Sequence, residues 1–280
     1  MTDDSRHAFA EAARADRPDL ALLCLLLAAE AGPQVYGQGV DRGVDEAQIE
    51  LDELAGMLPY RPGGPQEWAR ATAELLGGRL GFHGSGEDYR RLESSLLPEV
   101  LRRRRGLPIL LSVVWLEVAR RAGAPVYGVA LPGHFVIGFG DPQGPGTPVL
   151  ADPFDGGRPL SAADAELLVV GATGQGLTPS MMRPADPLEI VLRILNNIRA
   201  WAASRPERSE VHLWAVELPL LLPAHPARLR LERAQLLVDR GDFAKGATEM
   251  DEYAAMLTNV DPAAAKIIQN QARTARARMN

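Results

Sequence analysis

The sequence contains a single cysteine, Cys24, among 280 residues. One cysteine excludes an intrachain disulfide and a cysteine-rich zinc site. Because Cys24 stands in the apolar run at residues 20–27, we expect a buried, unreactive thiol. That run is much shorter than the roughly 20 residues of a membrane span. Residues 1–4 lack the basic start of a signal peptide, so we predict a cytoplasmic protein.

The chain also lacks a net positive charge, because 36 acidic residues outnumber 30 lysines and arginines and the formal net charge is −6. This balance argues against a general nucleic-acid binder. The four arginines at 102–105 are a local exception, and we interpret them as a solvated, salt-bridged face before a helix. Regulation through a nucleic-acid target would rest on this run alone. Four histidines are scattered without ligand spacing, so we predict no metal site and no cofactor: His7, His83, His212 and His225.

Helical periodicity dominates the first 125 residues. The segments with this pattern are residues 5–31, 44–58, 66–80, 94–103 and 109–121. Gly106-Leu107-Pro108 opens the last of them, because proline is favoured in a first helical turn. Residues 126–131 then have the composition of a strand.

The next stretch predicts a β-hairpin that brings a histidine to an aspartate. Residues 134–139 and 148–152 are β-prone, and residues 140–147 between them are rich in turn residues. A turn centred near Gln143 places His134 opposite Asp152, where an imidazole and a carboxylate touch as base and orienter. One helix followed by three strands indicates an α+β core, a small antiparallel sheet packed on a helix.

From about residue 187 the pattern is helical only, over 188–204, 209–222, 226–240, 243–257 and 262–279. Gly241-Asp242-Phe243 marks a tight turn between helices, with Ala234 before it and Ala247 after it. This spacing is typical of tetratricopeptide repeats, although Gly246 stands where their consensus has alanine. We therefore predict two domains, residues 1–180 and an all-α domain at 187–280.

Taken in order, these motifs resemble the SirB1 family, whose members join a transglutaminase-like domain to C-terminal tetratricopeptide-like helices. The resemblance covers most of the chain. Its carriers are Asp88-Tyr89, Gly106-Leu107-Pro108-Ile109, residues 117–123, Pro132-Gly133-His134-Phe135, residues 152–157, Leu195-Asn196-Asn197 and Gly241-Asp242-Phe243.

The resemblance implies a papain-like core, in which a helix carries the nucleophile at its start and a sheet carries His and Asp. His134 and Asp152 match those two positions. The cysteine of true transglutaminase-like enzymes would fall at or next to Pro108, where this chain has none. Pro108, Trp115 and Phe154 would line the cleft, although Trp115 also suits the core.

Two functions remain open on the sequence. The first is a pseudoenzyme, a non-catalytic protein that binds a protein or peptide and keeps the His–Asp pair as a remnant or as a lock of the sheet. The alternative is a hydrolase or acyl transferase with His134 as base, Asp152 as orienter and either Ser112 or water as nucleophile. Ser112 lies one turn inside the helix, so it is a nucleophile only if the register differs by a turn; otherwise it is a packing residue.

Overall fold

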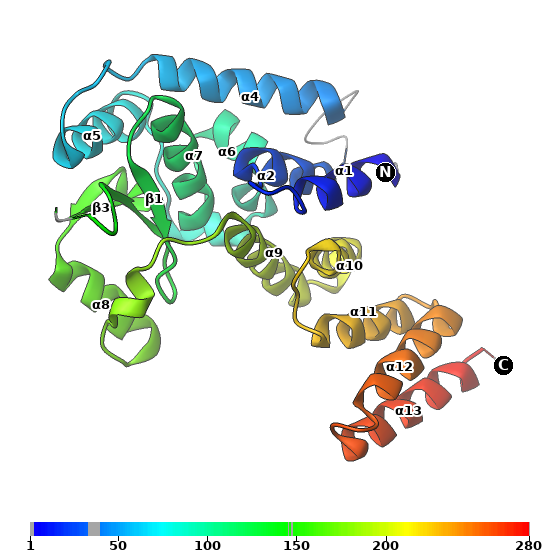
Figure 1. Cartoon of the computed structure of the whole chain (residues 1–280). Coiled ribbons are helices and arrows are strands. Elements are labelled where there is room, and N and C mark those ends of the chain that lie inside the picture. Colours follow the sequence, from blue (N-terminus) through cyan, green and yellow to red (C-terminus); the bar gives the residue numbers. More distant parts are fainter. Residues whose placement is uncertain (1–2, 33–39, 145, 147, 280) are drawn as a thin grey trace. The chain divides into compact units, whose positions relative to one another are not determined.

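The structure is a computed structural model that describes residues 3–32, 40–144, 146 and 148–279. The chain divides into an N-terminal unit, Met1–Ile194, and a C-terminal unit, Leu195–Asn280. Figure 1 shows the order of elements along the chain. The α-helices of the N-terminal unit are α1 (Asp3–Ala12), α2 (Leu20–Ala29), α4 (Val40–Gly56), α5 (Pro65–Thr72), α6 (Leu97–Arg103), α7 (Pro108–Arg121) and α8 (Ala162–Thr173), and α9 (Pro187–Ala203) crosses into the second unit.

The first helical segment is two helices, so the prediction of one helix over residues 5–31 was wrong. The chain leaves the helix after Ala12 and re-enters it at Leu20. Pro18 disfavours a helical residue before it. Asp19 then starts α2, because its side chain accepts a hydrogen bond from the Leu22 amide at 2.9 Å.

A four-stranded antiparallel meander follows α7, which confirms the α+β prediction. Its strands, in sheet order, are β1 (Val126–Val129), β2 (Val136–Phe139), β3 (Val149–Asp152) and β4 (Arg158–Leu160). The sequence prediction missed β4 and α8. Strand β4 is only three residues long and contains a proline, which hides the strand pattern.

The predicted hairpin register was wrong by two residues. Ile137 faces Ala151 and Phe139 faces Val149, so His134 lies before the first residue of β2 and diagonally from Asp152. Diagonal neighbours remain within reach of long side chains. Pro145 and Thr147 of the predicted turn lie outside the described residues.

Helix α7 is the centre of the N-terminal unit. Every residue from Pro108 to Ala119 is buried, since β1 and β2 pack on it together with α2, α4 and α6 (Figure 1). The sheet also contributes to a second apolar cluster, to which α8 adds Ala165 and Val169. Strand β2, which follows His134 in the chain, is therefore buried along its whole length.

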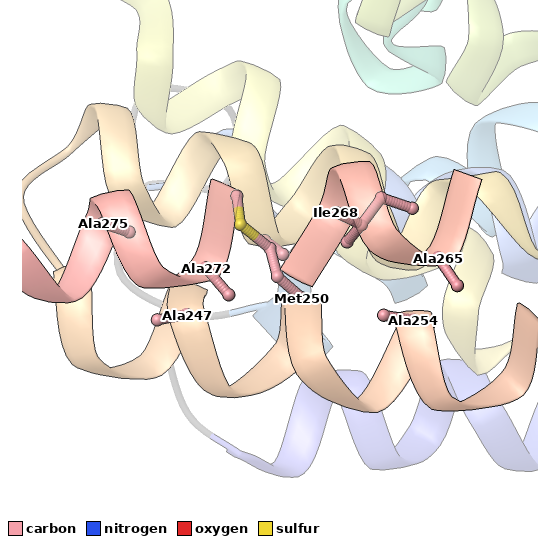
Figure 2. Close-up of a cluster of buried hydrophobic side chains, with 8 residues drawn as sticks. Ala247, Met250, Ala254, Ala265, Ile268, Ala272 and Ala275 are labelled. Atoms are coloured by element: carbon pink, nitrogen blue, oxygen red, sulfur yellow. The ribbon is translucent and has the colours of Figure 1, made fainter. Parts of the chain in front are cut away.

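The C-terminal unit is built from helices. They are α10 (Ser209–Glu217), α11 (Arg228–Asp239), α12 (Phe243–Leu257) and α13 (Pro262–Ala277). Small residues such as Ala247, Ala254 and Ala272 form most of the interface between α12 and α13, around Met250 and Ile268 (Figure 2).

Helices α11 and α12 approach closely at Gly246. A Cβ added at Gly246 would lie 2.7 Å from the Ala234 carbonyl oxygen and 2.6 Å from Val238 Cγ2. The helices and their tight turn at Gly241 agree with the sequence prediction. Whether they are tetratricopeptide repeats stays a prediction. Within the described ranges, no helix combines the length and apolar character needed to cross a membrane.

Candidate functional site

A tight turn presents His134 at the entrance to β2. Pro132 and Gly133 are its central residues, and the His134 amide donates to the Leu131 carbonyl at 3.2 Å. Proline fixes the first central position, and Gly133 adopts a φ of +72°, which favours glycine at the second. A Cβ at Gly133 would also lie 2.6 Å from the Cβ of Ala172 on α8. Local sequence and tertiary packing therefore select the same residue.

Asp152 closes β3 and holds the imidazole. Its Oδ2 lies 2.9 Å from His134 Nε2, and its Oδ1 accepts from the Phe154 amide at 2.9 Å. The Asp152 residue is 5% exposed and the His134 side chain is 12% exposed. The predicted contact between His134 and Asp152 is therefore present, despite the shifted register.

The pairing determines which imidazole nitrogen is free. A carboxylate group accepts hydrogen bonds, so the contact assigns the donor role to Nε2. In the neutral imidazole the lone pair is then on Nδ1, and the structure gives Nδ1 no hydrogen-bond partner among the described residues. This is the arrangement of a base and its orienter.

The first turn of α7 offers no nucleophile to that base. Pro108 and Ile109 begin the helix, both buried. Ser112 is fully buried one turn later, and its hydroxyl donates to the Phe135 carbonyl at 3.2 Å. This bond places α7 beside the segment that carries His134, but it commits the hydroxyl to the backbone. Cys24 is buried in α2, and burial raises the pKa of its thiol well above the usual range.

One aromatic ring meets the imidazole, and a second ring packs on the first. Phe154 meets the His134 ring edge-on, with centroids 6.0 Å apart, and Tyr89 meets Phe154 at 6.1 Å. Gly84 lies against Phe154: its amide donates to the Phe154 carbonyl at 2.9 Å, and a Cβ there would lie 2.0 Å from the ring. Phe154, a predicted cleft residue, is thus a half-buried neighbour of His134.

The adjacent residue, Asp88, anchors the loop that carries Tyr89. Asp88 is 2% exposed, and its carboxylate accepts hydrogen bonds from Ser85, Ser94 and Arg105, with Arg103 at 3.6 Å. Burial alone would raise the pKa of Asp88, but the hydrogen bonds from Ser85 and Arg105 outweigh it and hold that pKa below its usual value. The loop is therefore fixed to the segment that leads into α7.

The arginine run is mainly structural. Arg103 and Arg105 bind Asp88, Arg102 pairs with Glu99 at 2.6 Å, and Arg104 donates to the Leu80 carbonyl at 2.9 Å. The salt bridges were predicted, but Arg103 points inward, with only 17% of its side chain exposed, rather than onto a solvated face.

Arg193 on α9 supports the turn before His134. Its Nη2 donates to the carbonyls of Leu131 and His134, both at 2.7 Å, and its guanidinium lies over the Phe135 ring at 5.7 Å. Sequence reasoning identified neither Arg193 nor the position of Tyr89. Two sequence motifs could have pointed to these residues: Asp88-Tyr89 contains Tyr89, and Leu195-Asn196-Asn197 lies next to Arg193.

Trp115 lies apart from these residues. It is fully buried in α7 and packs edge-on against Phe82 at 5.9 Å, so it belongs to the core and does not line an open cleft. Pro108 is likewise buried. No cluster of three or more His, Cys, Asp or Glu side chains suited to a metal ion occurs within the described part of the chain.

Comparison with known proteins places this architecture in a family. A family profile described as the transglutaminase-like superfamily matches residues 34–196. A UPF0162 protein of Xylella fastidiosa (strain 9a5c) is 32% identical over 239 residues, which cover 82% of this chain and 80% of that protein. A UPF0162 protein of Pseudomonas aeruginosa is 31% identical over 204 residues, or 70% of this chain and 69% of that protein.

A more distant similarity is confined to part of the chain. F-box only protein 21 of Mus musculus is 26% identical over 162 residues, which are 56% of this chain and 25% of that protein. The profile match spans the helix, the sheet and the His134–Asp152 pair. The chain therefore belongs to the transglutaminase-like superfamily and, within it, to the UPF0162 proteins.

Proposed function

We propose that this protein is a non-catalytic member of the superfamily, of the SirB1 type, that binds a protein or peptide at the His134–Asp152 site. The observation that carries the proposal is the start of α7. Pro108 and Ile109 occupy the place where the resemblance puts the attacking cysteine, and neither side chain is a nucleophile. Loss of the nucleophile removes most of the rate of such an enzyme.

The state of Ser112 supports the same conclusion. Its hydroxyl is fully buried and already donates to the Phe135 carbonyl. To act as a nucleophile, it would have to abandon that bond and reach an incoming acyl group from inside the core. The burial of Cys24 in α2 likewise separates the one thiol from this chemistry.

One observation favours an enzyme instead. The His134–Asp152 pair is intact, and Nδ1 is available to activate a water molecule. A hydrolase or acyl transferase of this kind needs no side-chain nucleophile, so it remains the second candidate.

A turnover assay separates the two functions. We expect hydrolysis of p-nitrophenyl acetate, and amine incorporation into a glutamine peptide, to proceed at the same rates with wild type, His134→Ala and His7→Ala. His7 is the control because it is an exposed histidine with 75% of its side chain accessible. Turnover that His134→Ala abolishes and His7→Ala retains would overturn the proposal and establish the enzyme.

The C-terminal helices enter the proposal as a second binding element. Their tight turns and small-residue interfaces support a tetratricopeptide-like packing, and surfaces of that type bind peptides. This part rests on analogy of fold. The placement of the protein in the cytoplasm likewise stays a prediction.

A further inference from the structure

Arg193 is a cation that has no carboxylate partner among the residues that the structure describes. Its Nη2 donates to two backbone carbonyls, and no described acidic side chain forms an ion pair with it. A guanidinium has five N–H groups in all. The Arg193 atoms Nε and Nη1 have no hydrogen-bond partner in the described chain, and neither is among the buried unsatisfied atoms. Their N–H groups therefore face solvent beside the His134 turn.

Leaving this charge uncompensated is costly. Arg193 is half-buried, and burial lowers the pKa of its guanidinium, because a charge is less stable away from water. The ring of Phe135 at 5.7 Å offsets only part of that cost. The hydrogen bonds that support the turn before His134 use Nη2 alone. They therefore do not explain why Nε and Nη1 of Arg193 face solvent.

A second donor and an apolar wall lie next to this edge. The Tyr89 hydroxyl is within electrostatic range of both Arg193 and Asp152. Its ring packs on Phe154, which in turn packs on His134. The oxygens of Asp152 bind His134 and the Phe154 amide, and among the described residues Asp152 forms no ion pair with Arg193.

We propose that Arg193 and the Tyr89 hydroxyl bind a carboxylate of a peptide, with the residue that bears it packed against Phe154. This inference rests on the proposed function, since it names the group that a binding protein would recognise at the same site. A carboxylate suits the arrangement, because charge-assisted hydrogen bonds to Arg and Tyr would compensate the cation where no side chain of the described chain does. An aromatic side chain on the ligand would extend the stack of Tyr89 and Phe154.

Three N-acetylated, unlabelled peptides test the proposal by isothermal titration calorimetry with the full chain. The first is Gly-Ala-Phe with a free C-terminal carboxylate, and the second is the same peptide as its C-terminal amide. The third is Gly-Asp-Phe as the amide, which moves the carboxylate to a side chain. We expect a carboxylate peptide to bind at least about tenfold more tightly than the uncharged amide. The first and third peptides distinguish a terminal carboxylate from a side-chain carboxylate.

Substitutions then assign the preference to the two donors. Arg193→Gln should abolish the discrimination between carboxylate and amide, and Tyr89→Phe should reduce it by about fivefold. Arg183→Gln is the control, because Arg183 is an exposed arginine that pairs with Glu189. The amide resonance of Phe154, which reports the bond to Asp152, should be unchanged in every variant. If Arg193→Gln disturbs it, Tyr89→Phe alone decides.

The outcomes that overturn the proposal are distinct from those of the turnover assay. Equal binding of all three peptides, binding of none at millimolar concentration, or full discrimination in Tyr89→Phe would each refute carboxylate recognition. None of these binding results would show that the protein has turnover that depends on His134, so the proposed non-catalytic function would stand. Conversely, turnover lost in His134→Ala refutes the non-catalytic function and leaves carboxylate binding to be judged by the peptides.

Discussion

The two units differ in what they bury. Within the described residues, every buried polar or charged side chain belongs to the N-terminal unit, including Asp88, Ser112, Glu117 and Asp152. The helical cluster of the C-terminal unit consists of alanines with Met250 and Ile268. Burial of polar groups costs free energy unless each finds a partner. Asp88, Ser112 and Asp152 find their partners in the segments that carry or adjoin His134, so these hydrogen bonds specify a particular arrangement of loops in addition to a stable core.

The largest expected effect comes from removing the central acceptor of such a network. Asp88→Ala leaves Arg103 and Arg105 without their carboxylate, so the N-terminal unit should lose about 3–5 kcal/mol of unfolding free energy. Hydrogen exchange, read separately for the two units, measures it. Glu87→Gln changes the exposed neighbour and should have no measurable effect. A loss as small as that of the control would show that the network contributes little.

The same carboxylate predicts an acid dependence confined to one unit. The pKa of Asp88 is lower in the folded chain than its ordinary value of 3.8, so its contribution to stability is complete above that value. It is lost as the pH falls through the lower, folded pKa. Urea unfolding between about pH 2 and pH 6 should therefore show an acid-induced loss that Asp88→Asn diminishes. An identical pH profile in the variant would contradict this assignment.

In the C-terminal unit, the sensitive feature is volume rather than charge. Gly246→Ala adds a Cβ 2.7 Å from a backbone oxygen of α11, and the helices must separate to admit it. The cost of overpacking, about 1–3 kcal/mol, should exceed the gain of up to about 1 kcal/mol in helix propensity. Gly171→Ala on α8, where nothing lies within 4 Å of the new Cβ, should instead stabilise the chain. Thermal unfolding of both variants compares the two cases directly.

The smallest expected effect concerns Ser112. Ser112→Ala removes one buried hydrogen bond to the Phe135 carbonyl and should cost about 1 kcal/mol in urea unfolding. Binding of the carboxylate peptides should be unchanged, because the hydroxyl points at the backbone. If the substitution instead abolished a measured turnover, Ser112 would be a nucleophile and the account of α7 would be wrong.

The sequence predicted the parts of the molecule that depend on local pattern. The helix starting at Pro108, the strands around His134 and the C-terminal helices follow from periodicity and from turn residues. The His134–Asp152 contact was also predicted, although from a register that the structure shifts by two residues. The His134–Asp152 contact is present in spite of this shift, because diagonal neighbours on one face of a hairpin are still close enough to touch.

The missed parts depend on distant segments. Arg193 joins the His134 turn from about sixty residues away, and no local pattern marks that pairing. Tyr89 reaches the site because Asp88 binds arginines that follow it in the chain. Strand β4 is defined by its pairing with β3, which three residues cannot reveal. Tertiary hydrogen bonds, rather than propensity, decided each of these.

The two acceptor oxygens of Asp152 constrain how relatives can diverge. The Phe154 amide and the His134 Nε2–H both donate to this side chain, one to each oxygen. Asparagine has one acceptor oxygen and would turn its own donor toward one of them. Divergence from Asp to Asn at position 152 should therefore be rare among relatives that retain the histidine, and common once the histidine is lost. Position 112, whose hydroxyl serves a single carbonyl, should vary more freely.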